Sequence, residues 1–375
     1  RWTQEVDKMV VIISCHHFPD DERIYHKQIK SLLKDGHRIL YYTRSNSSLN
    51  LSDGLITHKN FSIKLSINVF IDKVLQSIKS IGDINQVQIH EVELLPIIKK
   101  TKSISPKVLT IYDVHENMEA LYRTFSNRVR ILKELSIKVR NYNENKYLKY
   151  VDQIILANPP MGLKTYKDRS TTIIENFPEI KHLTPLEQIK KRKGNQILYH
   201  GHIGPERGLK ELVYAMRQVI EKVPSAYLSI VGTFRTNNFE NNIRNLIEEL
   251  DLQRSIMIVK QVPHSQIWEI INKHRVGVIP FRRTPLTEEN TPTKLFEMMI
   301  CGLELVVSKL PPAQSFLSNS VHWCDPDDIN SISESLISAL NVKGNLSNIH
   351  ENQRLIIEKY NWEKKEKDYL TLFKY

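Results

Sequence analysis

A short charged segment in the second half of the chain begins a predicted helix. Thr291 precedes Pro292, and this pair is typical of an N-cap followed by proline at the first helical position. The predicted helix puts Lys294 in its first turn, where a cation is unfavourable unless an anion lies close by. Free N–H groups at a helix start bind phosphate, and Lys294 would add charge. Pairing of Lys294 with Glu289 or Glu297 on a solvated face explains the same residues equally well.

A second segment, residues 198–212, places glycines and polar side chains between an apolar run and an amphipathic stretch. Gly201 would let the backbone approach a ligand closely, and His202 and Arg207 follow it. The spacing differs from G-x-G-x-x-G and does not support a dinucleotide-binding fingerprint. Taken alone, the segment is a weak phosphate-loop signal, and an ordinary strand-to-helix turn is the simpler interpretation.

A third segment runs from an apolar stretch, residues 109–112, into Asp113, His115 and Glu116. Polar residues at the carboxyl ends of parallel strands face the ligand crevice in doubly wound folds. His115 could therefore donate a hydrogen bond to a substrate or a leaving group. A histidine that caps a loop is the alternative, and these residues alone favour it.

The elements that position these segments follow from hydrophobic patterning. Short apolar runs alternate with stretches of helical length, which is typical of parallel strands joined by crossover helices. The pattern predicts an α/β fold made of doubly wound halves. Strands are expected at residues 9–14, 38–43, 87–89, 108–112, 153–156, 172–174, 196–199, 227–231, 256–259, 276–279 and 305–308, and helices at 22–34, 209–223, 241–250, 265–274 and 292–301.

The length of the chain predicts two domains. Its 375 residues exceed the roughly 250 to 300 that one hydrophobic core serves. A polar stretch that ends at residues 190–194 separates the two α/β halves, so we expect a boundary between residues 185 and 186. A ligand site in a cleft between the halves is the default for this architecture.

Composition excludes several classes of protein. A hydrophobic content of 41% and a charged content of 25% exclude bulk disorder. Three scattered cysteines form no C-x-x-C pair, so neither a disulfide framework nor a zinc site is expected, and a reducing compartment fits best. No apolar run approaches a membrane span. We therefore expect a cytoplasmic protein, with peripheral membrane contact left open.

The net charge of +11 is concentrated in one segment, residues 121–150, which has eight basic side chains against two acidic ones. Apolar residues recur there at helical spacing, as in one or two amphipathic helices. A core helix with a solvated cationic face is the first interpretation. Docking to anionic lipid is the second, and nucleic-acid binding lacks the motifs it would need. The candidates for an acceptor or membrane surface are Arg123, Arg128, Arg130 and Lys133.

Together these segments resemble retaining glycosyltransferases of the GT-B fold, family 4 type. Glu289 and Glu297 are separated by seven residues, which matches the E-x7-E element of that family, and residues 290–297 with Gly302 are similar to a common variant of it. Further segments that resemble the family are residues 16–24 with 36–37, residues 113–116, which are similar to the segment bearing its active-site histidine, residues 176–178, and Trp362 with the last helix.

The resemblance implies two Rossmann-like domains. Residues 1–185 would form the acceptor domain, with a C-terminal helix at about 358–375 packing back on it, and residues 186–357 would bind the donor. A nucleotide sugar, UDP-linked or GDP-linked, would be the substrate, and neither a metal nor another cofactor would be needed. Departure of the diphosphate builds negative charge that preorganised cations stabilise.

The same resemblance implies roles for individual residues. Glu297 would hydrogen-bond the donor ribose, and Glu289 would lie near the sugar hydroxyls. His115 would contact the sugar close to its anomeric carbon, which gains oxocarbenium character. Many relatives carry arginine at the position of His202, and a neutral histidine supplies a donor without fixed charge. Arg207 and Lys294 would neutralise the diphosphate, in a donor site that also includes Gly201, His202 and Thr293.

The implied activity is transfer of a sugar, with retention, to a glycan, lipid-linked or cell-envelope acceptor, as in polysaccharide biosynthesis. A nucleotide-sugar 2-epimerase of the same fold is one alternative, and a non-catalytic binder of nucleotide sugars or anionic glycans is another. The E-x7-E spacing and residues 113–116 favour transfer, and no nucleic-acid partner is expected. The base, the sugar, the acceptor, the linkage and the oligomeric state stay open.

Overall fold

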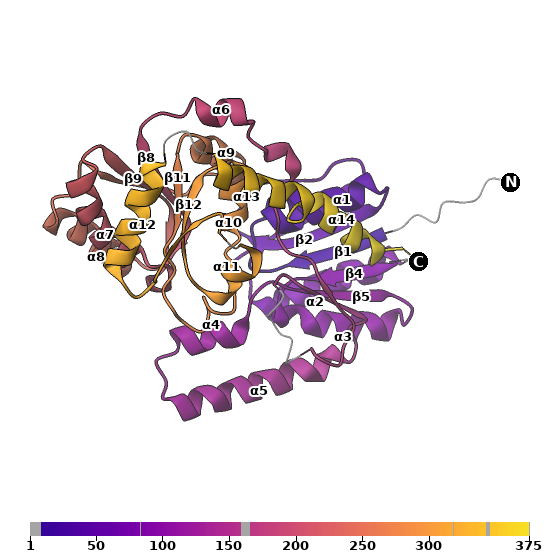
Figure 1. Cartoon of the computed structure of the whole chain (residues 1–375). Coiled ribbons are helices and arrows are strands. Elements are labelled where there is room, and N and C mark those ends of the chain that lie inside the picture. Colours follow the sequence, from indigo (N-terminus) through magenta and orange to yellow (C-terminus); the bar gives the residue numbers. More distant parts are fainter. Residues whose placement is uncertain (1–8, 83, 159–165, 318, 343–345, 375) are drawn as a thin grey trace. The chain divides into compact units, whose positions relative to one another are not determined.

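The computed structural model describes residues 9–82, 84–158, 166–317, 319–342 and 346–374 (Figure 1). Its contacts divide the chain into two compact units. Unit 1 comprises the described residues up to 176 and from 364 onward, and unit 2 comprises those from 177 to 363.

Unit 1 is built on a seven-stranded parallel sheet with the order β3-β2-β1-β4-β5-β6-β7. The apolar core packs α2 and α3 against one face of this sheet, and α1 and α14 lie on the other face (Figure 1). The strands are β1 (Met9–Ser14), β2 (Arg38–Ser45), β3 (Ile56–Ser62), β4 (Gln86–Ile89), β5 (Leu109–Val114), β6 (Gln153–Leu156) and β7 (Thr171–Ile173). The helices are a π-helix (Glu22–Ile29) that continues into α1 (Lys30–Lys34), then α2 (Ile67–Ile81), α3 (Leu95–Ile104), α4 (Met118–Phe125), α5 (Arg130–Leu148) and α14 (Trp362–Thr371), whose residues from Lys364 belong to this unit.

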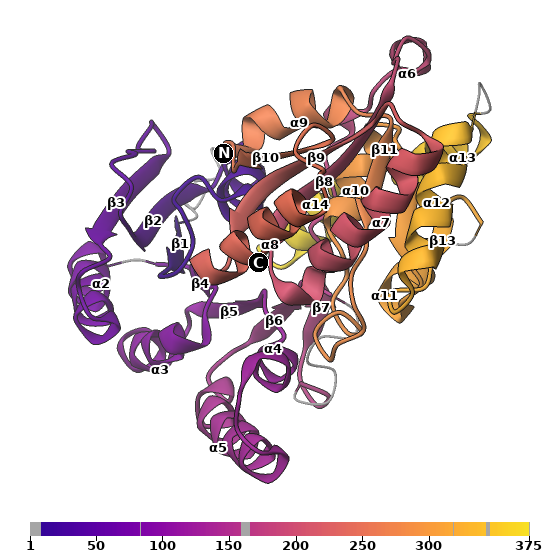
Figure 2. The same ribbon diagram turned by 90° about the vertical axis from the view of Figure 1, so that its left-hand side faces the viewer.

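Unit 2 has a six-stranded parallel sheet with the order β10-β9-β8-β11-β12-β13. One core packs α7, α8 and α12 against the sheet, and a second packs α9, α10 and α13 (Figure 2). The strands are β8 (Asn195–Ile203), β9 (Ala226–Phe234), β10 (Ile256–Lys260), β11 (Val276–Ile279), β12 (Glu304–Ser308) and β13 (His322–Cys324). The helices are α6 (Leu186–Lys190), α7 (Leu209–Lys222), α8 (Asn237–Glu249), α9 (His264–Asn272), α10 (Lys294–Ile300), α11 (Pro311–Phe316), α12 (Ile329–Asn341) and α13 (Ser347–Glu358).

The expected α/β class with two doubly wound sheets is confirmed, and the sheets differ from expectation at their edges. Each expected strand is present, but β3 and β13 were not expected. β3 is an edge strand whose first residues alternate between buried and exposed positions, so it lacks the continuous apolar run of a central parallel strand. β13 has only three residues. Of the described helices, none is long and apolar enough to cross a bilayer.

The contacts divide the chain after Asn176, so the expected boundary between residues 185 and 186 falls inside unit 2. Aromatic packing accounts for the earlier division. The ring of Phe177 lies 4.7 Å from that of Phe296 and 5.4 Å from that of Tyr360, and both partners belong to unit 2. Residues 177–185 therefore pack with unit 2, because edge-to-face and tilted aromatic pairs contribute strongly to a core.

Candidate functional site

Three nitrogen atoms surround the buried carboxylate of Glu297 in unit 2. Lys294 opens α10, and Glu297 lies one turn later, so Lys294 Nζ reaches Glu297 Oε1 at 3.3 Å. His264, at the start of α9, places Nε2 3.4 Å from the same oxygen. His200 on β8 places Nε2 3.5 Å from Oε2. Helix α10 thus carries an ion pair that is held against the carboxyl end of the central strand.

The charges in this cluster follow from burial and from the neighbouring cation. Burial by itself raises the pKa of Glu297. The charge of Lys294 and the hydrogen bond with His264 outweigh burial and bring this pKa well below its usual range. Burial lowers the pKa of His200 to about 3. At neutral pH the cluster therefore holds an ionised Glu297, a cationic Lys294 and a neutral His200.

Two paired glycines let Lys294 approach the end of β8. Gly201 has φ of +123°, and a Cβ atom there would lie 3.3 Å from Lys294 Cε. Gly232 is its partner on β9, and a Cβ atom at Gly232 would collide with the Gly201 carbonyl. The predicted strand-to-helix turn at Gly201 and His202 is not found there, because β8 continues through both residues to Ile203. Ladder pairing with β9 extends the strand past its apolar run.

A second cationic group follows directly along the chain. Pro205–Arg207 form a 3₁₀ turn, in which the buried Glu206 accepts two hydrogen bonds from Arg235, at 3.0 and 2.8 Å. Arg207 Nε lies 3.3 Å from Glu206 Oε1, and its guanidinium lies over the ring of Phe281 at 4.5 Å from the centroid. Bidentate pairing and stacking therefore fix both arginines near one end of the sheet.

Arg235 also explains the state of His202. Arg235 Nε donates to His202 Nε2 at 3.3 Å. Burial lowers the pKa of His202, and the charges of Arg235 and Arg207 lower it further. His202 is thus a neutral acceptor, and the cation beside it is Arg235. Sequence reasoning missed this arginine, although it follows Gly232 by three residues at the carboxyl end of β9.

The helix start differs from expectation by two residues. Helix α10 begins at Lys294, whereas the Thr291-Pro292 pair predicts a start at Pro292. Leu295 N–H bonds to the Pro292 carbonyl at 2.9 Å, and Phe296 N–H bonds to the Thr293 carbonyl at 3.2 Å. These short-range bonds form a 3₁₀ turn that satisfies the early N–H groups.

Glu289 and Thr293 lie on either side of this turn. Glu289 is half-buried, in a turn that precedes the helix, and its N–H bonds to the Leu286 carbonyl at 3.4 Å. Thr293 is half-buried and stands immediately before α10, without a capping hydrogen bond from its side chain. The two carboxylates of the E-x7-E element thus differ in environment, because Glu297 is buried beside Lys294 and two histidines whereas Glu289 is only half-buried.

In unit 1, His115 belongs to a buried polar cluster at the carboxyl end of β5. Asp113 is fully buried and accepts two hydrogen bonds from Arg23, at 3.1 and 2.8 Å. His115 Nε2 lies 3.2 Å from Asp113 Oδ2 and 2.8 Å from His90 Nδ1. Arg23 lies on the π-helix and His90 follows β4, so the sheet order brings these residues together. Sequence reasoning identified His115 but missed both neighbours.

Electrostatics makes Asp113 ionised and His115 neutral. Burial raises the pKa of Asp113. Interactions with Arg23 and His115 outweigh burial and bring this pKa well below its usual range. Burial lowers the pKa of His115 to about 4, against the opposing charge of Asp113. Ligand atoms of His90, Asp113 and His115 lie within 4.8 Å of one another, a spacing that a metal ion could occupy, but the guanidinium of Arg23 opposes a second cation beside the same carboxylate.

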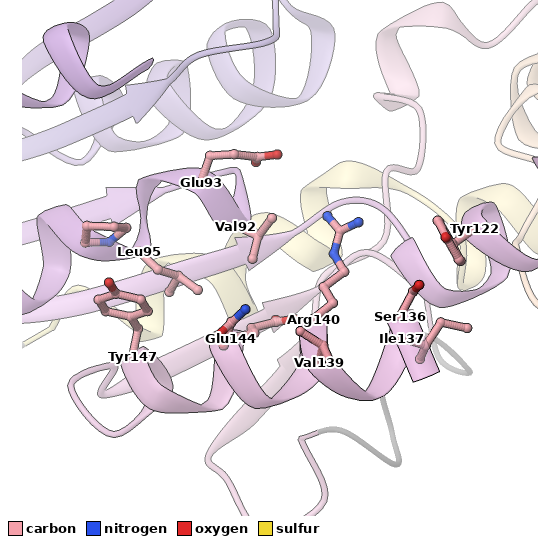
Figure 3. Close-up of a pocket in the computed structure, with 12 residues that line it drawn as sticks. Val92, Glu93, Leu95, Tyr122, Ser136, Ile137, Val139, Arg140, Glu144 and Tyr147 are labelled. Atoms are coloured by element: carbon pink, nitrogen blue, oxygen red, sulfur yellow. The ribbon is translucent and has the colours of Figure 1, made fainter. Parts of the chain in front are cut away.

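The basic segment forms α4 and α5, and most of its apolar residues face outward. Ile131 is 82% exposed and Tyr142 is 75% exposed, and only Ile137, Glu144 and Leu148 of α5 are buried. The core-helix interpretation is therefore wrong for most of α5. A pocket of about 480 Å³ lies beside the helix, and its lining comes from α5, from Tyr122 on α4 and from residues 92–96 (Figure 3).

The four candidate cations of this segment are placed differently. Arg123 pairs with Glu119 at 3.2 Å and with Glu134 at 3.1 Å, which ties α4 to α5. Lys133 Nζ donates to the Arg123 carbonyl at 3.2 Å. Arg128 donates to Ser136 at 2.9 Å, and Arg128 and Arg130 are both exposed. The outward cations are thus interspersed with exposed apolar side chains.

Acid destabilisation is expected to begin well above the range in which carboxylates titrate. His115 and His200 bind protons only near pH 4 and pH 3 in the folded protein, but near 6.5 when unfolded. The unfolded chain therefore binds more protons between these values, and the free energy of unfolding falls as pH is lowered from about 6.5. Urea denaturation at pH 7, 6 and 5 measures this slope. His200→Gln should reduce the slope, whereas His350→Gln, at an exposed position, should leave it unchanged; equal slopes in all three proteins would contradict the prediction.

Comparison with known proteins agrees with this geometry. The family model described as Glycosyl transferases group 1 matches residues 185–356. Sucrose-phosphate synthase from Thermosynechococcus elongatus is similar in structure, with a TM-score of 0.77 and 16% identity over 98% of each chain. HepE from Anabaena in complex with UDP-glucose has a TM-score of 0.73 and 13% identity, over 97% of this chain and 98% of that one. A UDP-forming trehalose-phosphate synthase from Burkholderia xenovorans has a TM-score of 0.73 and 12% identity over 98% of each chain.

None of the curated proteins matches the chain by sequence. The fold and its solved neighbours define a GT-B protein. Residues 185–356 carry a domain of the glycosyl transferases group 1 family.

Proposed function

We propose that the protein transfers a sugar from a UDP-linked or GDP-linked donor to a glycan, lipid-linked or cell-envelope acceptor, with unit 2 binding the donor. The observation that carries this proposal is the buried Glu297–Lys294 ion pair beside Gly201, inside the matched domain. Two structural neighbours favour UDP, since one is a complex with UDP-glucose and the other is named UDP-forming.

In this proposal Lys294 and Arg207 neutralise the diphosphate of the donor. Charge grows on the phosphate oxygens as the bond to the sugar breaks, and cations held in place beforehand stabilise it without reorganisation. Packing along Gly201 holds the stem of Lys294, and stacking on Phe281 orients Arg207. Arg235, which donates a hydrogen bond to the uncharged His202, adds a third cation to the site. No metal ion is required for this charge balance.

The remaining site residues position the nucleoside and the sugar. Glu297 accepts hydrogen bonds from the ribose hydroxyls, for which an ionised carboxylate is suited. Glu289 lies near the sugar hydroxyls, and Gly201, His202 and Thr293 line the donor site. His115 contacts the sugar close to its anomeric carbon. As a neutral imidazole it adds no positive charge beside a carbon that becomes cationic.

Incubation with nucleotide sugars and candidate acceptors tests this function. UDP-glucose, other UDP-sugars and GDP-sugars are supplied with and without glycan or lipid-linked acceptors. Transfer releases nucleotide in proportion to the acceptor modified, whereas a 2-epimerase interconverts donors without acceptor and a binding protein does neither. A thermal-shift comparison of UDP, GDP and ADP identifies the base, because a ligand at 100 times its Kd stabilises by about 2.7 kcal/mol. Donor interconversion without acceptor would overturn the proposal.

For the acceptor side, we propose that α4 and α5 contact an anionic membrane that carries the acceptor. Exposed apolar residues such as Ile131 alternate with the cations Arg128, Arg130 and Lys133. Apolar insertion combined with attraction to anionic headgroups is the usual physics of interfacial helices. Residues 121–150 have a charge of +6 and expose apolar side chains. Such a surface is more stable against an anionic membrane than in water.

Binding to vesicles tests the membrane surface. The protein is expected to float with vesicles containing phosphatidylglycerol at low salt, and not with neutral phosphatidylcholine vesicles. Arg130→Glu with Lys133→Glu should weaken binding by at least about 30-fold, since each cation near the surface contributes about 1 kcal/mol. The matched control is Lys191→Glu with Lys193→Glu, which changes charge equally at exposed positions of unit 2. Equal binding by both double variants would contradict a surface on α4 and α5.

A further inference from the structure

A buried chain of hydrogen bonds in unit 1 connects α14 with the cluster around His115. Tyr369 Oη donates to Gln88 Oε1 at 2.8 Å. Gln88 Nε2 donates to Gln28 Oε1 at 2.9 Å, and Gln28 Nε2 donates to Asp113 Oδ2 at 2.6 Å. These four side chains are all fully buried, so water cannot replace the partners.

The ionised Asp113 fixes the direction of this chain. Its carboxylate can only accept hydrogen bonds, so Gln28 must turn its amide nitrogen toward it. The amide oxygen of Gln28 then faces Gln88, which must in turn present its own nitrogen. Arg23 keeps Asp113 ionised through its two hydrogen bonds. The orientation of Gln88 therefore follows from a charge two residues away in the network.

The orientation of Gln88 decides which nitrogen of His90 carries the proton. Gln88 Nε2 lies 3.2 Å from His90 Nε2, and an amide nitrogen only donates. His90 Nε2 must accept, so a neutral His90 carries its proton on Nδ1. This N–H faces His115 Nε2 at 2.8 Å. Two N–H groups cannot face each other at that distance, so His115 Nε2 accepts.

We propose that Gln88 and His90 are positioning residues that hold His115 as the tautomer protonated on Nδ1. Among the described residues, Nδ1 of His115 has no hydrogen-bond partner, and the side chain is 10% exposed. His115 then offers a neutral N–H donor to an oxygen atom of the sugar. This inference rests on the proposed role of His115 at the donor sugar. The competing arrangement has His115 Nε2–H donate to Asp113 Oδ2, 3.2 Å away.

Nitrogen NMR of the protein labelled with ¹⁵N in its histidine rings distinguishes the two tautomers. At pH 7 and without substrate, His115 is expected to show an unprotonated Nε2 and a protonated Nδ1, and His90 the same. Protonation of His115 on Nε2 would overturn the inference. Because no nucleotide sugar is present, this result is independent of whether the proposed function holds.

Gln88→Glu tests the positioning role, because it replaces the donating nitrogen with an accepting oxygen at constant shape. His90 should then move its proton to Nε2, His115 should become protonated on Nε2, and kcat/KM for the donor should fall ~10-fold, as for one lost hydrogen bond. Gln86→Glu is the matched control, since it also buries a carboxylate on β4. It should leave both tautomers and the activity unchanged. A tautomer change in Gln88→Glu without loss of activity would overturn the positioning role, and the NMR of the unmodified protein decides the tautomer if Gln88→Glu does not fold.

Discussion

Replacing Lys294 with alanine is expected to lower kcat/KM for the nucleotide-sugar donor by about 10²- to 10³-fold, as when one preorganised group that stabilises developing charge is lost. The loss has two sources in the site. The diphosphate loses a cation that Gly201 and α10 hold in place. Glu297 loses the ammonium group 3.3 Å from its carboxylate, so one of the contacts that orient this acceptor toward the ribose is gone.

Steady-state release of nucleotide in the presence of acceptor measures this effect. Lys294→Arg keeps the charge and should retain more activity than the alanine variant, although its planar head cannot occupy the same position. Lys273→Ala is the matched control, because Lys273 forms an ion pair with Glu269 at 2.7 Å on the surface of the same unit. Its activity and melting temperature should stay close to those of the unmodified protein. Full turnover by Lys294→Ala, with the fold intact, would remove Lys294 from the donor site.

The second large effect is expected for His115→Ala, with kcat falling about 10²-fold or more and KM for the donor changing little. The imidazole would contact the sugar near the anomeric carbon, so its contribution belongs mainly to the transition state. His115 is neutral throughout the neutral range because its pKa is lowered to about 4. Between pH 6 and pH 8, titration of His115 should therefore add no inflection to the rate profile of the unmodified protein.

Single-turnover kinetics separates chemistry from binding in this variant. His26→Ala is the control, since His26 lies on the π-helix of the same unit and contacts Lys30 instead of the buried cluster. It should behave as the unmodified protein does. A His115→Ala variant that loses only donor affinity would show that His115 binds the donor without acting on the chemical step.

Much of the fold was predictable because its cause is local in the sequence. Apolar runs separated by helical stretches indicate parallel sheets, and β1, β6 and β11 have the expected bounds. The Glu297–Lys294 pair was equally accessible, since three residues along a helix place side chains on one face. The continuation of β8 was not, because pairing with β9 overrides local preference there. The 3₁₀ turn before α10 was not either, because its i→i−3 bonds take the place of the first helical turn.

The sequence by itself determined the α/β class, the E-x7-E element and His115 as candidates for chemistry. The tertiary structure alone decided which residues set their charge and proton positions. Arg23 and Asp113 are 90 residues apart in the chain, and Arg235 and His202 are 33 apart. Parallel strands bring their carboxyl ends to one edge of a sheet, so such neighbours come from different crossovers. A protonation state depends on burial and on charges within a few ångströms, and neither can be read from spacing along the chain.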